Sequence, residues 1–284
     1  MAKRLISAGI ATAFGVGMLA LDNRIAFLIV ASLISVGIVY EILVATKYIA
    51  NAWVAFISLF FVFAIPFIAT SDANFLNTRY ASFGLIIALF VIMLFSHQKV
   101  KFSQVALVTF VSLCVPFSFS CAIFLFDTVP AQHRVFALLY TLMITFINDS
   151  GAFFAGISLG KHKMAPQISP KKTWEGFAGG ILTAALFGFL LGKGYEIAAG
   201  VFGNGEVTFK ADLLFLSLMA IPCALLGVLG DLSASILKRE CAVKDFGNIM
   251  PGHGGLLDRF DGVLFVMPFT FLVFSQYFPI TEVA

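Results

Sequence analysis

Long runs of hydrophobic residues alternate with short polar stretches along the whole chain of 284 residues. A helix needs roughly 20 mostly apolar residues to cross the hydrocarbon core of a bilayer. The runs are continuous rather than alternating, which excludes an outer-membrane barrel. The pattern therefore predicts about nine membrane-spanning helices, near residues 5–21, 25–44, 52–71, 80–97, 104–126, 134–158, 176–193, 211–230 and 262–280.

The composition agrees with this pattern, because 60% of the residues are hydrophobic and only 12% are charged. Soluble domains are about a quarter charged. We predict an all-α fold, a polytopic transmembrane helical bundle whose polar cytosolic loops form the active site. Residues 1–284 are expected to form one integral-membrane domain, with scaffold spans in 1–130 and a catalytic half in 131–284.

The lysines and arginines divide unevenly between the two sides of this predicted topology. The side that holds the N-terminus carries 13 of the 18 basic residues. The other side carries the remaining five, Arg24, Arg79, Arg134, Lys193 and Lys210. The positive-inside rule therefore assigns the N-terminal side to the cytosol. The first apolar run has no convincing cleavage site, so we expect it to be an uncleaved span.

The first of two polar segments in the second half covers residues 148–180. Asp149 lies within an apolar run, which is costly unless its carboxylate faces a cavity or a partner. Ser169 and Pro170 are typical of an N-cap and a first helical turn. Lys171 and Lys172 would then lie beside a helix N-terminus, a combination that suits an anion. Two pairs of glycines would allow close helix packing, Gly156 with Gly160 and Gly176 with Gly180.

The second polar segment covers residues 230–262. If the eighth span continues as a helix beyond the membrane, Asp231, Ser235 and Lys238 share one face of it. Glycines and a proline then end that helix, at Pro251, Gly252, Gly254 and Gly255. Asp258 and Asp261 are three residues apart where the ninth span begins, so both carboxylates can point the same way.

Aspartates opposite lysines at a membrane surface suit a metal-bound polyphosphate. Magnesium prefers carboxylate oxygens and keeps several waters, while lysine and arginine neutralise the remaining phosphate charge. Each residue also has a simpler interpretation: an acid as a helix cap or surface charge, and a basic cluster as a topology signal or a contact with anionic lipid. The density of charged residues among glycines favours the metal and phosphate interpretation, with Asp231, Asp258 and Asp261 as the candidate metal ligands.

Two short motifs have other familiar meanings that the sequence excludes. "KDFG" (244–247) matches part of a kinase motif, but neither a kinase catalytic loop nor a glycine-rich nucleotide loop accompanies it. "DRFDG" (258–262) begins the CDP-alcohol phosphotransferase pattern, but the residues that must follow are missing. The four cysteines show no paired spacing that would indicate a metal site, so we expect small apolar side chains.

The pattern "SxLKRxxxxKDxGxxMPGHGGLLDRFD", from Ser235 to Asp261, closely resembles the signature of the integral-membrane phosphatidate cytidylyltransferases, also called CDP-diacylglycerol synthases. "SPKKTWEG" (169–176), which follows "DSGAFFAG", resembles an upstream segment of the same family. The resemblance is strong over about 145–270. It departs from the family at Ala234, where glutamate is common, and at Phe246, where serine is common.

This resemblance implies the transfer of CMP from CTP to phosphatidate, which gives CDP-diacylglycerol and pyrophosphate. It implies magnesium as a cofactor, with a monovalent cation such as potassium beside it. The expected partners are CTP, phosphatidate, the lipid bilayer and a second copy of the chain in a homodimer, with no nucleic acid. The expected location is the bacterial inner (plasma) membrane, with the active site facing the cytoplasm.

The resemblance and the residue chemistry together select three groups of site residues. The predicted catalytic residues are Asp231, Lys238, Arg239, Lys244, Asp245, His253 and Arg259. The predicted substrate-binding residues are Asp149, Ser169, Lys171, Lys172, Ser235, Gly254 and Gly255. The predicted metal ligands are Asp231, Asp258 and Asp261.

Two other functions compete with this one. An ion-coupled transporter would use Asp149 and Asp231 in a translocation path, but transporters often carry broken helices in both halves, and the polar motifs here lie in one half. A CTP-dependent kinase of polyprenols or other lipid alcohols would transfer the γ-phosphate and release CDP. The released nucleotide therefore distinguishes the kinase from the cytidylyltransferase.

Overall fold

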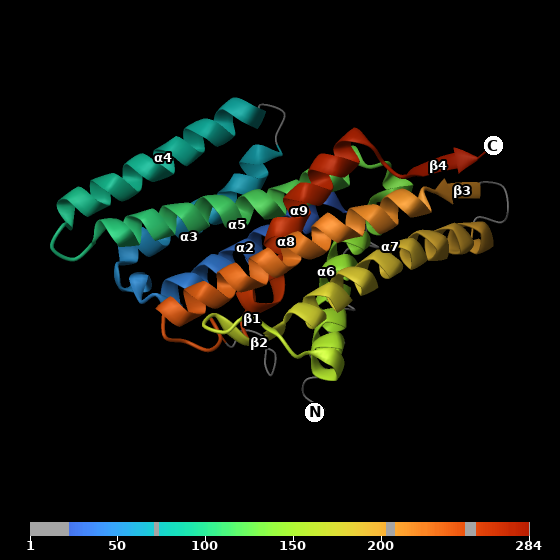
Figure 1. Cartoon of the computed structure of the whole chain (residues 1–284). Coiled ribbons are helices and arrows are strands. Elements are labelled where there is room, and N and C mark those ends of the chain that lie inside the picture. Colours follow the sequence, from blue (N-terminus) through green and yellow to red (C-terminus); the bar gives the residue numbers. More distant parts are fainter. Residues whose placement is uncertain (1–22, 71–73, 203–207, 248–253, 284) are drawn as a thin grey trace. The chain divides into compact units, whose positions relative to one another are not determined.

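The structure is a computed structural model that describes residues 23–70, 74–202, 208–247 and 254–283. Within these residues the chain is mainly helical (Figure 1). The helices are α2 (Arg24–Ala45), α3 (Ala52–Ala69), α4 (Asn74–Phe95), α5 (Phe102–Thr128), α6 (Arg134–Leu159), α7 (Trp174–Phe202), α8 (Leu213–Glu240) and α9 (Leu257–Gln276), with short 3-10 turns η1 (Tyr48–Ala50) and η2 (Ala131–His133). Four strands form two small antiparallel sheets, β1 (Lys163–Ala165) with β2 (Ser169–Thr173), and β3 (Thr208–Ala211) with β4 (Ile280–Val283).

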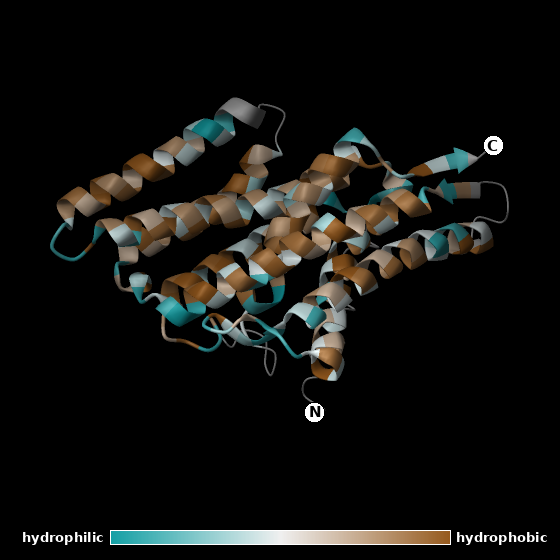
Figure 2. Ribbon diagram, in the orientation of Figure 1, coloured by the Kyte–Doolittle hydropathy of each residue, from teal (hydrophilic) through white to brown (hydrophobic). Residues whose placement is uncertain are grey.

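Seven helices in the described part of the chain, α2 to α8, are long and apolar enough to cross a membrane. They coincide with the second to eighth predicted spans, and Figure 2 shows that their ribbons are largely hydrophobic. The ninth predicted span corresponds to α9, whose apolar stretch Val263–Gln276 is shorter. The predicted first span, 5–21, lies outside the described residues. The predicted class, an all-α protein of transmembrane helices, is confirmed.

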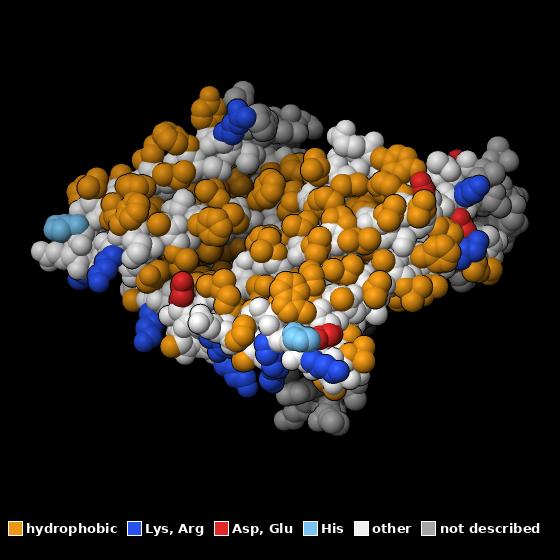
Figure 3. Space-filling model, in the orientation of Figure 1, with side chains coloured by type: hydrophobic (Ala, Val, Ile, Leu, Met, Phe, Trp, Pro, Cys, Tyr) orange, Lys and Arg blue, Asp and Glu red, His pale blue; other side chains and the backbone are white. Residues whose placement is uncertain are grey.

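Helix α8 shows the surface that a bilayer requires. Leu214, Leu218, Leu225 and Leu229 are all exposed. Their spacing of four, seven and four residues places them on one face of the helix. Hydrophobic side chains also cover most of the helical surface visible in Figure 3. Contiguous apolar surface of this kind is unfavourable in water and favourable against lipid tails.

The chain divides into two compact units. The first unit consists of residues 1–124 and 237–260, and the second consists of residues 125–236 and 261–284. In the first unit, α3 packs against both α2 and α4. In the second unit, α6 packs extensively against α7, and the β1–β2 hairpin connects these two helices. The signature region 237–260 thus belongs to the same unit as the N-terminal helices.

Glycines allow α6 and α7 to approach closely, as their spacing predicts. A Cβ atom on Gly176 would lie 2.7 Å from the carbonyl oxygen of Ala152 and 3.2 Å from the Cα atom of Gly156. A Cβ atom on Gly180 would lie 2.7 Å from Oδ1 of Asn148. No larger side chain fits at either position without moving a helix, so this packing holds the end of α6 beside the start of α7.

The predicted helix start at Ser169 and Pro170 is wrong. Residues Ser169–Thr173 form strand β2, and α7 begins at Trp174. Thr173 acts as the cap instead, because its Oγ1 accepts a hydrogen bond from the backbone N–H of Gly176 at 3.1 Å. The fixed φ of proline also suits an extended strand, and pairing with β1 extends the segment up to Thr173. Lys171 and Lys172 therefore lie on a strand that leads into the helix.

Candidate active site

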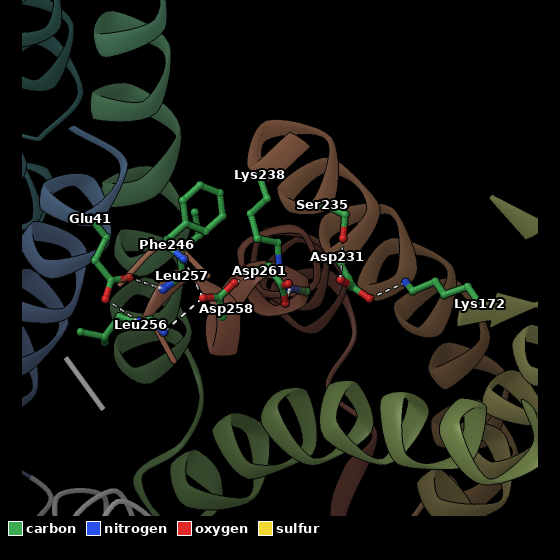
Figure 4. A network of polar contacts seen from close by, with 12 residues as sticks. Glu41, Lys172, Asp231, Ser235, Lys238, Phe246, Leu256, Leu257, Asp258 and Asp261 are labelled. Carbon is green, nitrogen blue, oxygen red and sulfur yellow. Dashed lines mark hydrogen bonds and ion pairs between the residues drawn. The ribbon is translucent and has the colours of Figure 1, made fainter. Parts of the chain in front are cut away.

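In the second unit, three elements bring charged side chains together around Asp231. We call Asp149, Lys172, Asp231 and Ser235 the Asp231 cluster. Lys172 from β2 forms an ion pair with Oδ2 of Asp231 on α8 (Figure 4). One turn further along α8, the hydroxyl of Ser235 donates to Oδ1 of Asp231 at 3.4 Å. Asp149 on α6 interacts electrostatically with both Asp231 and Lys172.

The position of Asp231 follows from a close helix crossing beside it. Gly230 lies against the backbone of Asp261 and Gly262 on α9, where a Cβ atom would come within 2.9 Å of the Gly262 Cα atom. Only glycine permits such an approach. The side chain of Asp261 is buried, and its Oδ1 accepts the N–H of Gly262 at 2.7 Å. The crossing therefore fixes the turn of α8 that carries Asp231.

In the first unit, the signature segment folds around Asp258. We call Lys238, Asp258 and the backbone N–H groups of Phe246 and Gly255 the Asp258 cluster. The Nζ of Lys238 lies 2.9 Å from Oδ1 of Asp258. The N–H groups of Phe246 and Gly255 donate to Oδ2 of Asp258 at 3.0 and 3.1 Å. This carboxylate thus joins the end of α8, the following loop and the start of α9.

A buried glutamate lies against the same loop. Glu41 on α2 is only 2% exposed. Its Oε1 accepts the N–H of Leu256 at 2.9 Å, and its Oε2 accepts the N–H of Leu257 at 3.0 Å (Figure 4). An open pocket of about 580 Å³ adjoins it, lined by Tyr40, Glu41 and Val44 of α2 and by Val243–Gly247. The N-terminal spans thus contribute an acid to the loop that carries the signature.

Comparison with known proteins agrees with these motifs. The model of the family described as "Cytidylyltransferase family" matches residues 2–277, nearly the whole chain. The chain belongs to the cytidylyltransferase family. The phosphatidate cytidylyltransferase of Bacillus subtilis (strain 168) is 42% identical over 146 residues, which are 51% of this chain and 50% of that protein.

Two further relatives of this chain bear the same name. The phosphatidate cytidylyltransferase of Haemophilus influenzae (strain ATCC 51907 / DSM 11121 / KW20 / Rd) is 38% identical over 137 residues, 48% of this chain and 45% of that protein. The one from Staphylococcus aureus (strain COL) is 32% identical over 255 residues, 89% of this chain and 83% of that protein. The chain spans about half the length of the first two relatives and most of the third.

The structure places the predicted site residues of this chain in different environments. Some lie in the Asp231 and Asp258 clusters described above. Others are exposed on β2, on the last turn of α8, in the loop after it or at the start of α9, namely Lys171, Arg239, Lys244, Asp245 and Arg259. Ser169 is half-buried on β2, Gly254 has a positive φ of 86° beside Asp258, and His253 lies outside the described residues.

The three predicted metal ligands do not form a ready-made cluster. In the described part of the chain, no three His, Cys, Asp or Glu side chains lie close enough together to hold a metal ion. Lysine ammonium groups stand beside two of the predicted ligands, Asp231 and Asp258. Carboxylate oxygens are the donors that magnesium prefers. The carboxylate donors of Asp231 and Asp258 therefore fit magnesium, and the lysine beside each of them shows that a positive charge is stabilised there.

One cysteine, Cys241, lies within the signature itself. Burial raises the pKa of the Cys241 thiol above its ordinary value, and the neighbouring Glu240 carboxylate raises it further. The thiolate is the reactive form of cysteine, so at neutral pH this residue stays a protonated thiol. A covalent intermediate on Cys241 is therefore disfavoured.

Glu41 is the residue of this region that the sequence analysis missed. The sequence pattern predicts only scaffold spans in residues 1–130. One signal was present, because Glu41 is an ionisable residue within the apolar run 25–44, and such residues tend to be paired or functional. Its partners could not be inferred, since they are backbone N–H groups more than 200 residues away in the sequence.

Proposed function

We propose that this chain is a phosphatidate cytidylyltransferase, which transfers CMP from CTP to phosphatidate. The observation that carries the proposal is the pairing of Lys172 with Asp231. Lys172 belongs to the "SPKKTWEG" motif, and Asp231 lies four residues before the signature that begins at Ser235, within the region 145–270 where the resemblance is strong. Family membership and the names of the relatives support the same activity.

The proposed reaction is a displacement at phosphorus. An oxygen of the phosphatidate phosphate attacks the α-phosphorus of CTP, and the new P–O bond forms the pyrophosphate linkage of CDP-diacylglycerol. The bond between the α-phosphorus and the oxygen bridging to the β-phosphorus breaks, and pyrophosphate leaves. The attacking phosphate is already an anion, so the reaction needs charge stabilisation and positioning more than a strong base.

The chain's own basic residues are suited to the phosphates. Lys172 is held by Asp231, and Lys238 is held by Asp258, so both ammonium groups are oriented before a ligand arrives. We infer that they neutralise phosphate charge, and that the exposed Lys171, Arg239, Lys244 and Arg259 contribute to the surrounding positive field. Gly254 keeps the loop backbone free of a side chain where phosphate oxygens would approach, whereas Gly255 is buried against Glu41.

We also propose magnesium as the cofactor, with Asp231 and Asp258 as its carboxylate ligands and Asp261 as a third candidate. When bound, the ion would neutralise the triphosphate and the departing pyrophosphate. Asp231 keeps acceptor capacity beyond its contacts with Lys172 and Ser235. A potassium ion beside the magnesium is a further proposal from the family resemblance.

The decisive experiment supplies purified protein with phosphatidate, magnesium and CTP labelled at the α-phosphate, followed by lipid extraction. We expect the label to enter the lipid fraction and unlabelled pyrophosphate to be released. A parallel reaction uses CTP labelled at the γ-phosphate and contains a polyprenol and diacylglycerol as acceptor alcohols. Label entering lipid only in the γ-labelled reaction would identify a lipid kinase, and label entering lipid in neither reaction, with folded protein, would reject both activities.

We propose that the chain lies in the bacterial inner membrane with the two motifs facing the cytoplasm, as the distribution of basic residues indicates. In a chain stripped of its four cysteines, Gln167→Cys should react with an impermeant thiol reagent only after spheroplasts are opened. Labelling of Gln167→Cys in intact spheroplasts would show that the topology is the reverse of the one proposed. A homodimer is also proposed from the resemblance, and the mass of the detergent-solubilised protein tests it.

A further inference from the structure

Glu41 is a buried carboxylate in α2, a helix that is otherwise mostly apolar. Its side chain is 2% exposed, and among the described residues no lysine, arginine or histidine forms an ion pair with it. Burying an unpaired carboxylate is costly unless hydrogen bonds satisfy its oxygens. The Glu41 carboxylate therefore needs hydrogen-bond donors that offset the cost of its burial.

Those partners are the backbone N–H groups of Leu256, just before α9, and of Leu257, the first residue of α9. The N–H of Leu256 donates to Oε1 and the N–H of Leu257 donates to Oε2 of Glu41. The first N–H groups of a helix have no partner within the helix, and a negative charge there also interacts favourably with the helix dipole. Glu41 therefore caps α9 from a different helix.

Two glycines enclose the same carboxylate. A Cβ atom on Gly247 would lie 2.5 Å from Oε1 of Glu41, and one on Gly255 would lie 2.6 Å from Oε2. The loop of the signature thus closes around Glu41 at a distance that only glycine permits. This fit restricts how the loop and the start of α9 can be placed in the first unit.

The residue that follows this cap is Asp258. Its Oδ2 accepts the N–H of Gly255, so the backbone held by Glu41 also orients the Asp258 carboxylate. Three successive N–H groups are divided between the two acids: Gly255 donates to Asp258, while Leu256 and Leu257 donate to Glu41. A shift of this turn would displace Asp258 and, through it, Lys238.

We propose that Glu41 is a positioning residue, which fixes the first turn of α9 and thereby sets where the Asp258 carboxylate stands. It does not touch the substrate. The inference rests on the proposed cytidylyltransferase function, since it assigns Glu41 a part in that reaction, and it extends the active site to a span at the other end of the chain.

The test compares Glu41→Gln with Ser35→Ala, a change at another buried polar residue of α2 that bonds only to Ala31 within its own helix. Glutamine keeps the shape of glutamate but presents one N–H donor where the second backbone N–H needs an acceptor. Hydrogen exchange of purified protein in detergent is followed by mass spectrometry for peptides that cover 254–260 and α3.

In Glu41→Gln we expect amide exchange in 254–260 to rise at least tenfold, with α3 unchanged. The kcat for CMP transfer should fall at least tenfold, and the magnesium concentration for half-maximal rate should rise at least fivefold. The magnesium concentration for half-maximal rate does not depend on the fraction of the protein that is folded. Ser35→Ala should stay within twofold of wild type in every measurement.

Unchanged exchange at 254–260 in folded Glu41→Gln would overturn the proposal, as would raised exchange with wild-type kcat and magnesium dependence. If Glu41→Gln does not fold, Gly247→Ala pushes on the same carboxylate from the loop, and Gly84→Ala, with open space around it, is its control. A wild-type protein without CMP transfer would reject the proposed function, while the exchange data would still report whether Glu41 holds α9.

Discussion

Lys238–Asp258 in the first unit and Lys172–Asp231 in the second unit are ion pairs of the same residue types, but their carboxylates are held differently. The Asp258 side chain is 9% exposed and accepts two backbone N–H groups besides its lysine. The Asp231 side chain is 28% exposed, and its further hydrogen bond, from Ser235, is long at 3.4 Å.

The sequence predicts the same role, metal binding, for Asp231 and Asp258. The structure distinguishes them. A carboxylate whose acceptor positions are used by the chain's own backbone stabilises the fold around it. A carboxylate with spare acceptors and access to water can exchange a lysine for a ligand cation. We therefore expect Asp258 to matter for stability and activity, and Asp231 to matter for activity alone.

The largest effect is expected for Asp258→Asn. This change leaves the mostly buried Lys238 without its anion and turns an N–H donor toward the loop amides. Breaking a buried ion pair costs about 3–5 kcal/mol, so the melting temperature in detergent should fall and turnover should be lost. If Asp258→Asn melts at the same temperature as wild type, the Asp258 and Asp231 clusters do not differ in their contribution to stability.

Asp231→Asn is expected to lower kcat at least 100-fold while the melting temperature stays near that of wild type. The Lys172–Asp231 pair is half-buried, with 23% and 28% of the two side chains exposed, and Asp149 remains as a second anion that interacts with Lys172. Asparagine also keeps the shape of aspartate, so the loss of stability should be smaller than for Asp258→Asn. Turnover assays and thermal melts on one preparation give both quantities. Activity within about threefold of wild type, or about 0.7 kcal/mol of transition-state stabilisation, would reject a metal role for Asp231.

Lys172→Ala and Lys171→Ala form a matched pair on β2. Neighbouring residues of a strand point to opposite faces, and only Lys172 is paired with Asp231, whereas Lys171 is exposed. We expect kcat/KM to fall about 30-fold for Lys172→Ala and about fivefold for Lys171→Ala. Equal losses would mean that the ion pair with Asp231 does not determine which lysine meets the phosphate.

The smallest effect on activity is expected where helix packing supports the Asp231 cluster from a distance. Gly176→Ala places a Cβ atom 2.7 Å from the backbone oxygen of Ala152, so we expect destabilisation by about 1–3 kcal/mol. Gly194→Ala on the same helix meets nothing within 4 Å and should be neutral or slightly stabilising. Thermal melts of both variants measure the difference in stability. Equal melting temperatures would show that the contact between α6 and α7 is loose.

Most of the architecture was predictable because apolar runs of sufficient length have one favourable arrangement in a bilayer. Eight predicted spans correspond to α2–α9, and the continuation of α8 beyond residue 230 follows from its unbroken helical pattern. The start of α7 was not predictable in the same way. Ser169 and Thr173 are both good N-caps, and the choice between them depends on pairing with β1.

The same limit applies to the site. The sequence by itself determined that this is a membrane protein of spanning helices, and that its aspartates, lysines and glycines concentrate in two motifs, because hydropathy and motif spacing are local properties of a chain. Tertiary structure alone decided that Lys172 pairs with Asp231, and that Glu41 holds the turn before Asp258. A hydrogen bond depends on where two groups lie in space. The groups that bind Glu41 are backbone N–H groups, which almost every residue has, so the residue types in the sequence do not reveal them.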